Sequence, residues 1–121
     1  MRATAVTARK MLVGTGADDA ADLKKLTRQA GDAAQLLKLL GNEKRLLILC
    51  FLTARGEMTV GELVSAVKLS QSALSQHLAK LRADGLVAFR RTSQTLHYHV
   101  ADQRALHVLQ VLKKIYCGDL R

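Results

Sequence analysis

The stretch that decides how this chain folds is residues 69–87, LSQSALSQHLAKLRADGLV. Ser70 is a residue type that caps helix N-termini. Three leucines after it, Leu74, Leu78 and Leu81, recur at helical spacing, and polar residues occupy the opposite side. The stretch therefore predicts a helix that packs on its leucine side and presents a polar side.

A shorter helix is expected just before this one. Residues 59–62, TVGE, match a capping box, in which the Thr59 oxygen serves the amide of Glu62 and the carboxylate reaches back. The helix runs to about Val67, and Lys68-Leu69 joins it to the next. Two short helices joined in this way are typical of a helix-turn-helix.

Beyond Gly85, a good left-handed helix stop, the pattern changes from helical to alternating. Apolar residues alternate with others in 87–90 and again in 96–100, and the residues between, 91–94, are polar. This predicts a β-hairpin with a loose tip. A helix-turn-helix followed at once by a hairpin has the parts of a winged helix.

Three further helices are expected. An apolar stripe with heptad character begins after Asp18 and ends at Leu40. Asn42 is a good N-cap and Gly56 a good stop for a second helix, and Asp102 caps a last one. The stripe residues are Leu23, Leu26, Ala30, Ala33, Leu37 and Leu40 in the first helix, and Ala105, Val108, Leu112 and Ile115 in the last.

The fold class is therefore mainly α with a small β-hairpin, in the order α-α-α-α-β-β-α. Residues 1–17 show no clear pattern and are interpreted as a flexible tail, so that residues 18–121 form one domain. Hydrophobic residues make up 49% of the chain and aromatic residues only 3%, which favours packed helices over a β-sandwich.

Charge points to a polyanionic partner. Lys and Arg number 19 against 10 Asp and Glu, a net charge of +9, which suits nucleic acid or an anionic membrane surface. The longest apolar run, Leu46 to Leu52, is far shorter than the ~20 residues of a membrane span. Without a signal-peptide core near Met1, the expectation is a cytoplasmic protein with no membrane partner, whose cysteines are reduced.

The polar side of the 70–84 helix suits double-stranded DNA. Gln pairs with adenine in the major groove, Ser bonds base edges or phosphates, and the helix N-terminus attracts phosphate. Basic residues in the hairpin are expected to grip the DNA backbone. His77 has two open interpretations, a half-buried packing residue or a phosphate contact. The predicted DNA-binding residues are Ser70, Gln71, Ser72, Ser75, Gln76, His77, Lys80, Arg90, Arg91 and Gln94.

The 69–87 stretch resembles the DNA-binding signature of the ArsR/SmtB family, and residues 42–46 and 96–98 fit the same family. The resemblance covers roughly residues 30–117. It implies a homodimeric winged helix-turn-helix transcriptional regulator, with the first and last helices at the interface, on a pseudo-palindromic operator. The hairpin tip, residues 92–94, departs from the sequence common in relatives.

The family divides by inducer site, and the metal sites are missing from this sequence. No Cys stands at 61–64 for a thiolate cluster, and Asp102 and His107 are followed by lysines, which do not make a zinc site. His97 and His99 share a strand face, with no third ligand evident. No metal and no cofactor are expected, and a metal-sensing repressor stays as the alternative.

The two cysteines and their flanks, Cys50 and Cys117, resemble the BigR/SqrR/HlyU branch of the family. That resemblance implies a redox pair that senses reactive sulfur species or oxidants by forming a disulfide or polysulfide bridge, which weakens DNA binding. Burial in an apolar helix predicts a raised pKa for Cys50, and a fraying helix end predicts an accessible Cys117. Cys117 is therefore expected to react first. The alternative is two ordinary small apolar residues.

Two other classes of protein compare less well with this sequence. An enzyme is not expected, because Cys117 has no recognisable His–Asn or His–Asp partner and no Gly-rich phosphate loop is present. A winged-helix module that binds proteins without DNA stays open. The resemblance to the family favours a dithiol-switched transcriptional repressor.

Overall fold

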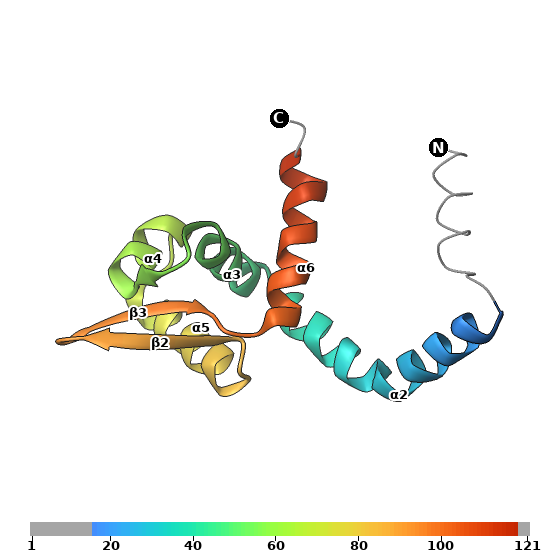
Figure 1. Cartoon of the computed structure of the whole chain (residues 1–121). Coiled ribbons are helices and arrows are strands. Elements are labelled where there is room, and N and C mark those ends of the chain that lie inside the picture. Colours follow the sequence, from blue (N-terminus) through green and yellow to red (C-terminus); the bar gives the residue numbers. More distant parts are fainter. Residues whose placement is uncertain (1–15, 119–121) are drawn as a thin grey trace. The chain divides into compact units, whose positions relative to one another are not determined.

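The computed structural model describes residues 16–118 and has the predicted winged helix-turn-helix order (Figure 1). The prediction of a flexible tail at residues 1–17 falls outside the described residues, except that Gly16 and Ala17 are helical. The elements are α2 (Gly16–Leu40), α3 (Glu43–Arg55), β1 (Met58–Thr59), α4 (Val60–Val67), α5 (Gln71–Ala83), β2 (Val87–Thr92), β3 (Thr95–Val100) and α6 (Gln103–Lys113), which ends in the π-helical turn η1 (Lys114–Gly118).

The chain divides into two compact units, Met1–Gln35 and Leu36–Arg121. The described part of the first unit is the N-terminal portion of α2, whose stripe leucines Leu23 and Leu26 are 57% and 58% exposed. The second unit contains the winged helix. None of the helices among residues 16–118 is long and apolar enough to cross a membrane.

The predicted helix caps are confirmed. Asn42 accepts a hydrogen bond from the Arg45 amide at 3.1 Å, and Ser70 accepts one from Ala73 at 3.1 Å. The capping box is complete, because the Glu62 amide donates to Thr59 Oγ1 and the Thr59 amide to the Glu62 carboxylate. Gly56, directly after α3, and Gly85, two residues after the end of α5, adopt φ of 87° and 79°, which suit glycine best.

The hairpin belongs to a three-stranded antiparallel sheet in the order β1-β3-β2. Its predicted loose tip is wrong, because the strands pair as far as Thr92 with Thr95 and leave a two-residue turn. β-Branched threonines favour that pairing, and Ser93 takes the positive φ of 57° that a tight turn requires. Strand β1 was not predicted. It pairs Met58 with Tyr98 and is too short to show a period.

The core of the second unit lies between α3, the leucine sides of α4 and α5, one face of the sheet and the start of α6. Its fully buried members include Ile48, Leu49, Leu52, Leu63, Leu74, Leu78, Leu81 and Leu109. The apolar run Leu46–Leu52 of α3 is not buried on all sides. Leu46, Cys50 and Phe51 are only partly buried, because one side of α3 borders a pocket beside α6.

Candidate DNA interface and thiol site

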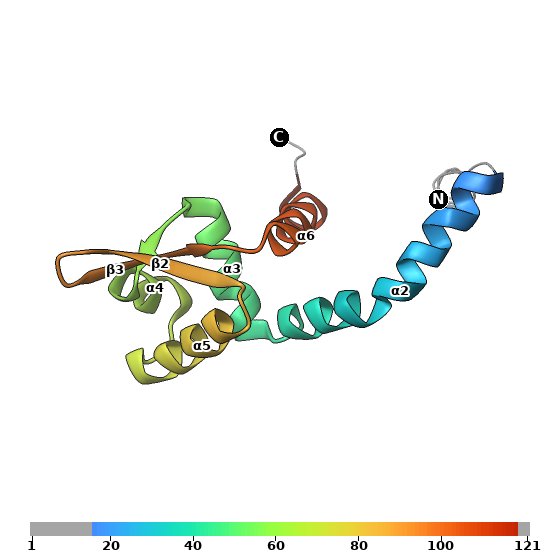
Figure 2. The ribbon, with the colours of Figure 1, turned by 60° about the horizontal axis from the view of Figure 1, so that its bottom comes forward.

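The polar side of α5 lies open to solvent. The leucines of α5 are buried, which fixes the rotation of the helix and leaves Gln71, Ser72, Ser75, Gln76 and Lys80 exposed. The turn before α5 is tight, because Lys68 adopts a left-handed conformation with φ of 60°. Both views place the hairpin beside α5 (Figures 1 and 2). The predicted helix and wing residues therefore belong to neighbouring elements.

Two predicted contact residues of α5, His77 and Lys80, differ from the others in their surroundings. His77 is half-buried at the edge of the leucine side, as one of its two interpretations required. Lys80 Nζ lies 3.5 Å from Asp84 Oδ2, one helical turn further on. An exposed pair of this kind contributes little to stability, so the Lys80 ammonium is free to exchange this partner for a phosphate.

The base of the wing is attached to α5 by an aromatic cluster that the sequence did not single out. The guanidinium of Arg82 lies over the Phe89 ring, 4.3 Å from its centroid. Phe89 in turn meets Tyr98 edge-on, with 5.4 Å between ring centroids. These contacts fix the hairpin against the C-terminal part of α5.

Arg90 and Arg91 project from opposite faces of β2, since side chains alternate along a strand. Arg90 Nε donates to both carboxylate oxygens of Glu57 at 2.9 Å, and its Nη2 lies 2.9 Å from Oε1. Hydrogen bonding from Arg90 is the main cause that lowers the pKa of Glu57, against a smaller desolvation effect. The sequence did not predict the pairing of Glu57 with Arg90, because Glu57 lies just before strand β1, which was not predicted either.

The two strand histidines lie on the same sheet face as this ion pair. His97 Nε2 and Thr92 Oγ1 are at hydrogen-bond distance, 2.8 Å, and His99 Nδ1 lies 4.0 Å from Glu57 Oε2. Among residues 16–118, no group of three or more His, Cys, Asp or Glu side chains is arranged to hold a metal ion.

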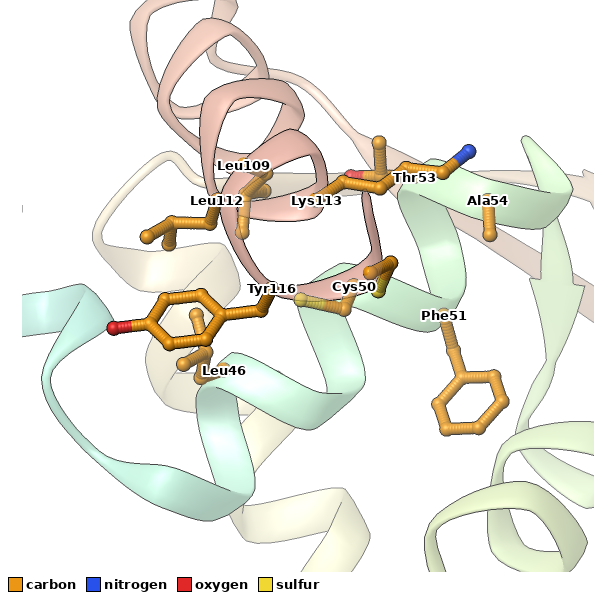
Figure 3. Close-up of a pocket in the computed structure, with 10 residues that line it drawn as sticks. Leu46, Cys50, Phe51, Thr53, Ala54, Leu109, Leu112, Lys113 and Tyr116 are labelled. Carbon is orange, nitrogen blue, oxygen red and sulfur yellow. The ribbon is translucent and has the colours of Figure 1, made fainter. Parts of the chain in front are cut away.

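Both cysteines line one pocket between α3 and the end of the α6 segment, with a volume of about 390 Å³ (Figure 3). In Figure 3 the side chains of Leu46, Cys50 and Tyr116 lie between the two helices. The wall residues are Leu46, Cys50, Phe51, Thr53, Ala54, Leu109, Leu112, Lys113, Tyr116 and Cys117. The sequence analysis predicted a role for both thiols, and in the structure both line the same cavity.

The two thiols are free and differ in their surroundings. Cys50 is half-buried, whereas Cys117 is exposed. Burial raises the pKa of the Cys50 thiol, and the charge of a Cys117 thiolate raises it further. At neutral pH, burial therefore makes Cys50 a weaker nucleophile than an ordinary exposed thiol.

The chain matches the family model described as bacterial regulatory protein, arsR family, over residues 42–88. The transcriptional activator HlyU of Vibrio cholerae is 45% identical over 96 residues, which cover 79% of this chain and 88% of that protein. The biofilm growth-associated repressor of Agrobacterium fabrum is 37% identical over 96 residues, covering 79% of this chain and 81% of that protein.

The fold agrees with solved structures of such proteins. The crystal structure of the transcriptional regulator HlyU from Vibrio vulnificus superposes with a TM-score of 0.74 at 45% identity. The match covers 79% of this chain and 99% of that one. Sequence and structure thus agree over most of the chain.

Proposed function

Because the chain belongs to the ArsR family of bacterial regulatory proteins, we propose that it is a transcriptional repressor whose DNA binding is switched by Cys50 and Cys117. DNA binding for transcription regulation follows from the family. Repression, the thiol switch and the inducer, a reactive sulfur species or an oxidant, are the proposal. The proposal includes a cytoplasmic location, because thiols stay reduced in the cytoplasm until an inducer oxidises them.

The DNA-binding surface consists of the exposed polar side of α5 together with the wing. Gln71 and Gln76 are placed to bond base edges in the major groove, and Ser70 at the N-cap to bond a phosphate. Arg91 and Gln94 in the wing hold the flanking backbone, whereas Arg90, predicted for the same role, is paired with Glu57 and supports the wing from its other face. The net charge of +9 supplies the sequence-independent part of the affinity.

A homodimer is part of the proposal because large apolar side chains are exposed on α2 and on the α6 segment. Leu23, Leu26, Leu37, Val111, Ile115 and Tyr116 are between 54% and 80% exposed. Apolar stripes of this kind mark protein interfaces. A two-fold dimer presents two copies of α5 to the two halves of a pseudo-palindromic operator.

One observation carries the switch, namely that the two cysteines of the chain are free thiols on the wall of one pocket. The exposed Cys117 reacts first with the inducer, and Cys50 then closes the bridge. A disulfide needs Cα atoms within ~7 Å, and an intervening sulfur atom relaxes this limit. A bridge fixes α3 to the end of the α6 segment and thereby changes the dimer that holds DNA.

The experiment compares a persulfide donor with zinc on the reduced protein. We expect the donor to release an operator duplex and to change the intact mass by loss of two hydrogens or gain of sulfur. Both effects disappear in Cys50→Ser and Cys117→Ser, whereas zinc leaves the complex intact. Release by zinc alone contradicts the switch and supports a metal sensor. Failure to bind any duplex in a salt-dependent way supports a protein-interaction module.

A further inference from the structure

The outer face of the three-stranded sheet, which points away from the core, carries a group of titratable side chains. Its members are Glu57, Arg90, His97 and His99. The hydrogen bond from Arg90 is the main cause that lowers the pKa of Glu57, and the charges of both histidines lower it further. The state of the two histidines therefore affects the carboxylate that holds Arg90.

His99 has a nitrogen without a hydrogen bond beside this carboxylate. Its Nδ1 is buried and has no hydrogen-bond partner, and it lies 4.0 Å from Glu57 Oε2. Histidine is the residue type whose charge ordinarily changes between pH 5 and 8. After a small movement, a protonated His99 donates from Nδ1 to Oε2. It then competes with Arg90 Nε, which donates to the same oxygen at 2.9 Å.

His97 acts on Arg90 from the neighbouring strand. The two residues stand directly opposite each other in the pairing of β2 with β3. Like charges in such a position are destabilising, so a protonated His97 repels the Arg90 guanidinium. The His97 ring keeps its place in either state, because the Thr92 hydroxyl at 2.8 Å can both accept and donate a hydrogen bond. Protonation of either histidine thus weakens the hold of Glu57 on Arg90.

The other charged groups near the ends of β3 are already engaged or open to solvent. Those contributed by the adjoining helices and their flanks are Arg55 after α3, Glu62 of α4, and Asp102 and Arg104 at the start of α6. The Glu62 carboxylate accepts from the Thr59 amide, and Asp102 is paired with Arg104. Arg55 is exposed. Among the described residues, Glu57 is therefore the carboxylate placed to respond to both histidines.

We propose that protonation of the two strand histidines releases Arg90 from Glu57 to contact a DNA phosphate, so that DNA binding tightens as the pH falls. Strand β2 is an edge strand and lies against α5 through the contact of Arg82 with Phe89. The Arg90 side chain, 53% exposed, reaches round this edge to the side of α5. By linkage, DNA binding then takes up protons. The inference rests on the DNA-binding surface proposed above and is independent of the cysteines.

The test measures the affinity of the full, reduced chain for the duplex that it selects from a random library, at pH 6 and pH 8. Glu57 stays ionised at both, because its pKa is lowered from 4.5. We expect about five- to tenfold tighter binding at pH 6 in 0.1 M salt, and a salt slope steeper by about 0.9, as one more phosphate contact requires. Arg90→Gln should lose this difference although both histidines remain. His77 is present in every variant, so its own titration cancels in the comparison.

Three further variants separate the parts of the group. The double variant His97→Gln/His99→Gln should bind at pH 6 as the unchanged protein binds at pH 8. Glu57→Gln lacks the carboxylate that holds Arg90 and should show the steeper salt slope already at pH 8. His107→Gln removes an exposed histidine of α6 and is the matched control, which should keep the whole difference between the two pH values.

A measurement without DNA tests the release of Arg90 separately. In thermal unfolding, the Tm effects of Glu57→Gln and Arg90→Gln should be less coupled at pH 6 than at pH 8, and equally coupled at both in the histidine double variant. Equal coupling at both pH values in the unchanged histidine background overturns the proposal. So does an Arg90→Gln variant that keeps the pH dependence of DNA affinity. If the coupling changes as expected but no duplex is bound at either pH, the DNA-binding surface itself fails, and the role of Arg90 at DNA fails with it.

Discussion

Glu57 and Arg90 form a two-pronged ion pair, in which Arg90 Nε donates to both carboxylate oxygens at 2.9 Å. Glu57 lies in the short link between α3, which carries Cys50, and strand β1. Arg90 lies in the wing strand β2. The pair therefore attaches the end of α3 to the wing, next to the pairing of Met58 with Tyr98.

This ion pair predicts an acid-dependent contribution to stability. Because Arg90 lowers the pKa of Glu57, the pair stabilises the folded state above the ordinary carboxyl pKa of 4.5. That contribution is lost as the pH falls through the lowered value. We expect Glu57→Gln to lower Tm at pH 7 and to lower it less as the pH falls below 4.5. Glu43→Gln, at an exposed site in the first turn of α3, is the control. A Tm difference independent of pH contradicts this role.

Asp102 is predicted to hold the start of α6. Its carboxylate accepts hydrogen bonds from the amides of Arg104 and Ala105 at 2.8 and 3.1 Å. Asp102→Ala should therefore lower the free energy of unfolding by about 0.5–2 kcal/mol in urea titrations. Asp102→Asn, which keeps the cap, should lose less. Equal losses in the two variants would show that the charge matters more than the cap.

The two thiols should react with iodoacetamide at different rates. Cys117 is exposed, whereas burial raises the pKa of Cys50. At pH 7 we expect Cys117 to be alkylated first in reduced protein, and the Cys50 rate to rise at higher pH, as measured by peptide mass spectrometry. Urea-unfolded protein, in which the difference should vanish, is the control. Faster alkylation of Cys50 in folded protein would contradict the proposed order of attack.

DNA-binding measurements should distinguish base recognition by α5 from backbone contacts made by the wing. Gln71→Ala and Gln76→Ala should weaken the best duplex selected from a random library by about 1–3 kcal/mol and relax its sequence preference. Arg91→Ala should weaken all duplexes alike and lower the salt slope by about 0.9. Lys38→Ala, a charge loss on α2, is the control. Unchanged preference in both glutamine variants would exclude α5 as the base-reading helix.

The elements that the sequence predicted well are those with strong local signals. The N-caps at Asn42, Ser70 and Asp102 and the leucine side of α5 each depend on residues within a few positions of one another. Such local patterns survive in the fold, because the tertiary contacts agree with them.

The features that escaped prediction depend on contacts between distant segments. Strand β1 exists because Met58 reaches Tyr98, and the Glu57–Arg90 pair follows from it. No local period marks either one. The pocket is a third case, because an apolar helix such as α3 does not reveal which of its sides a neighbour leaves uncovered.

The most direct test is the operator affinity of a single sample before bridging, after bridging and after reduction with dithiothreitol. Intact mass identifies the state of Cys50 and Cys117 at each step. The thiol switch predicts strong binding by the reduced protein, at least tenfold weaker binding once the bridge has formed, and recovery on reduction, a change in keeping with typical allosteric coupling. Equal affinity for the reduced and the fully bridged protein would contradict it.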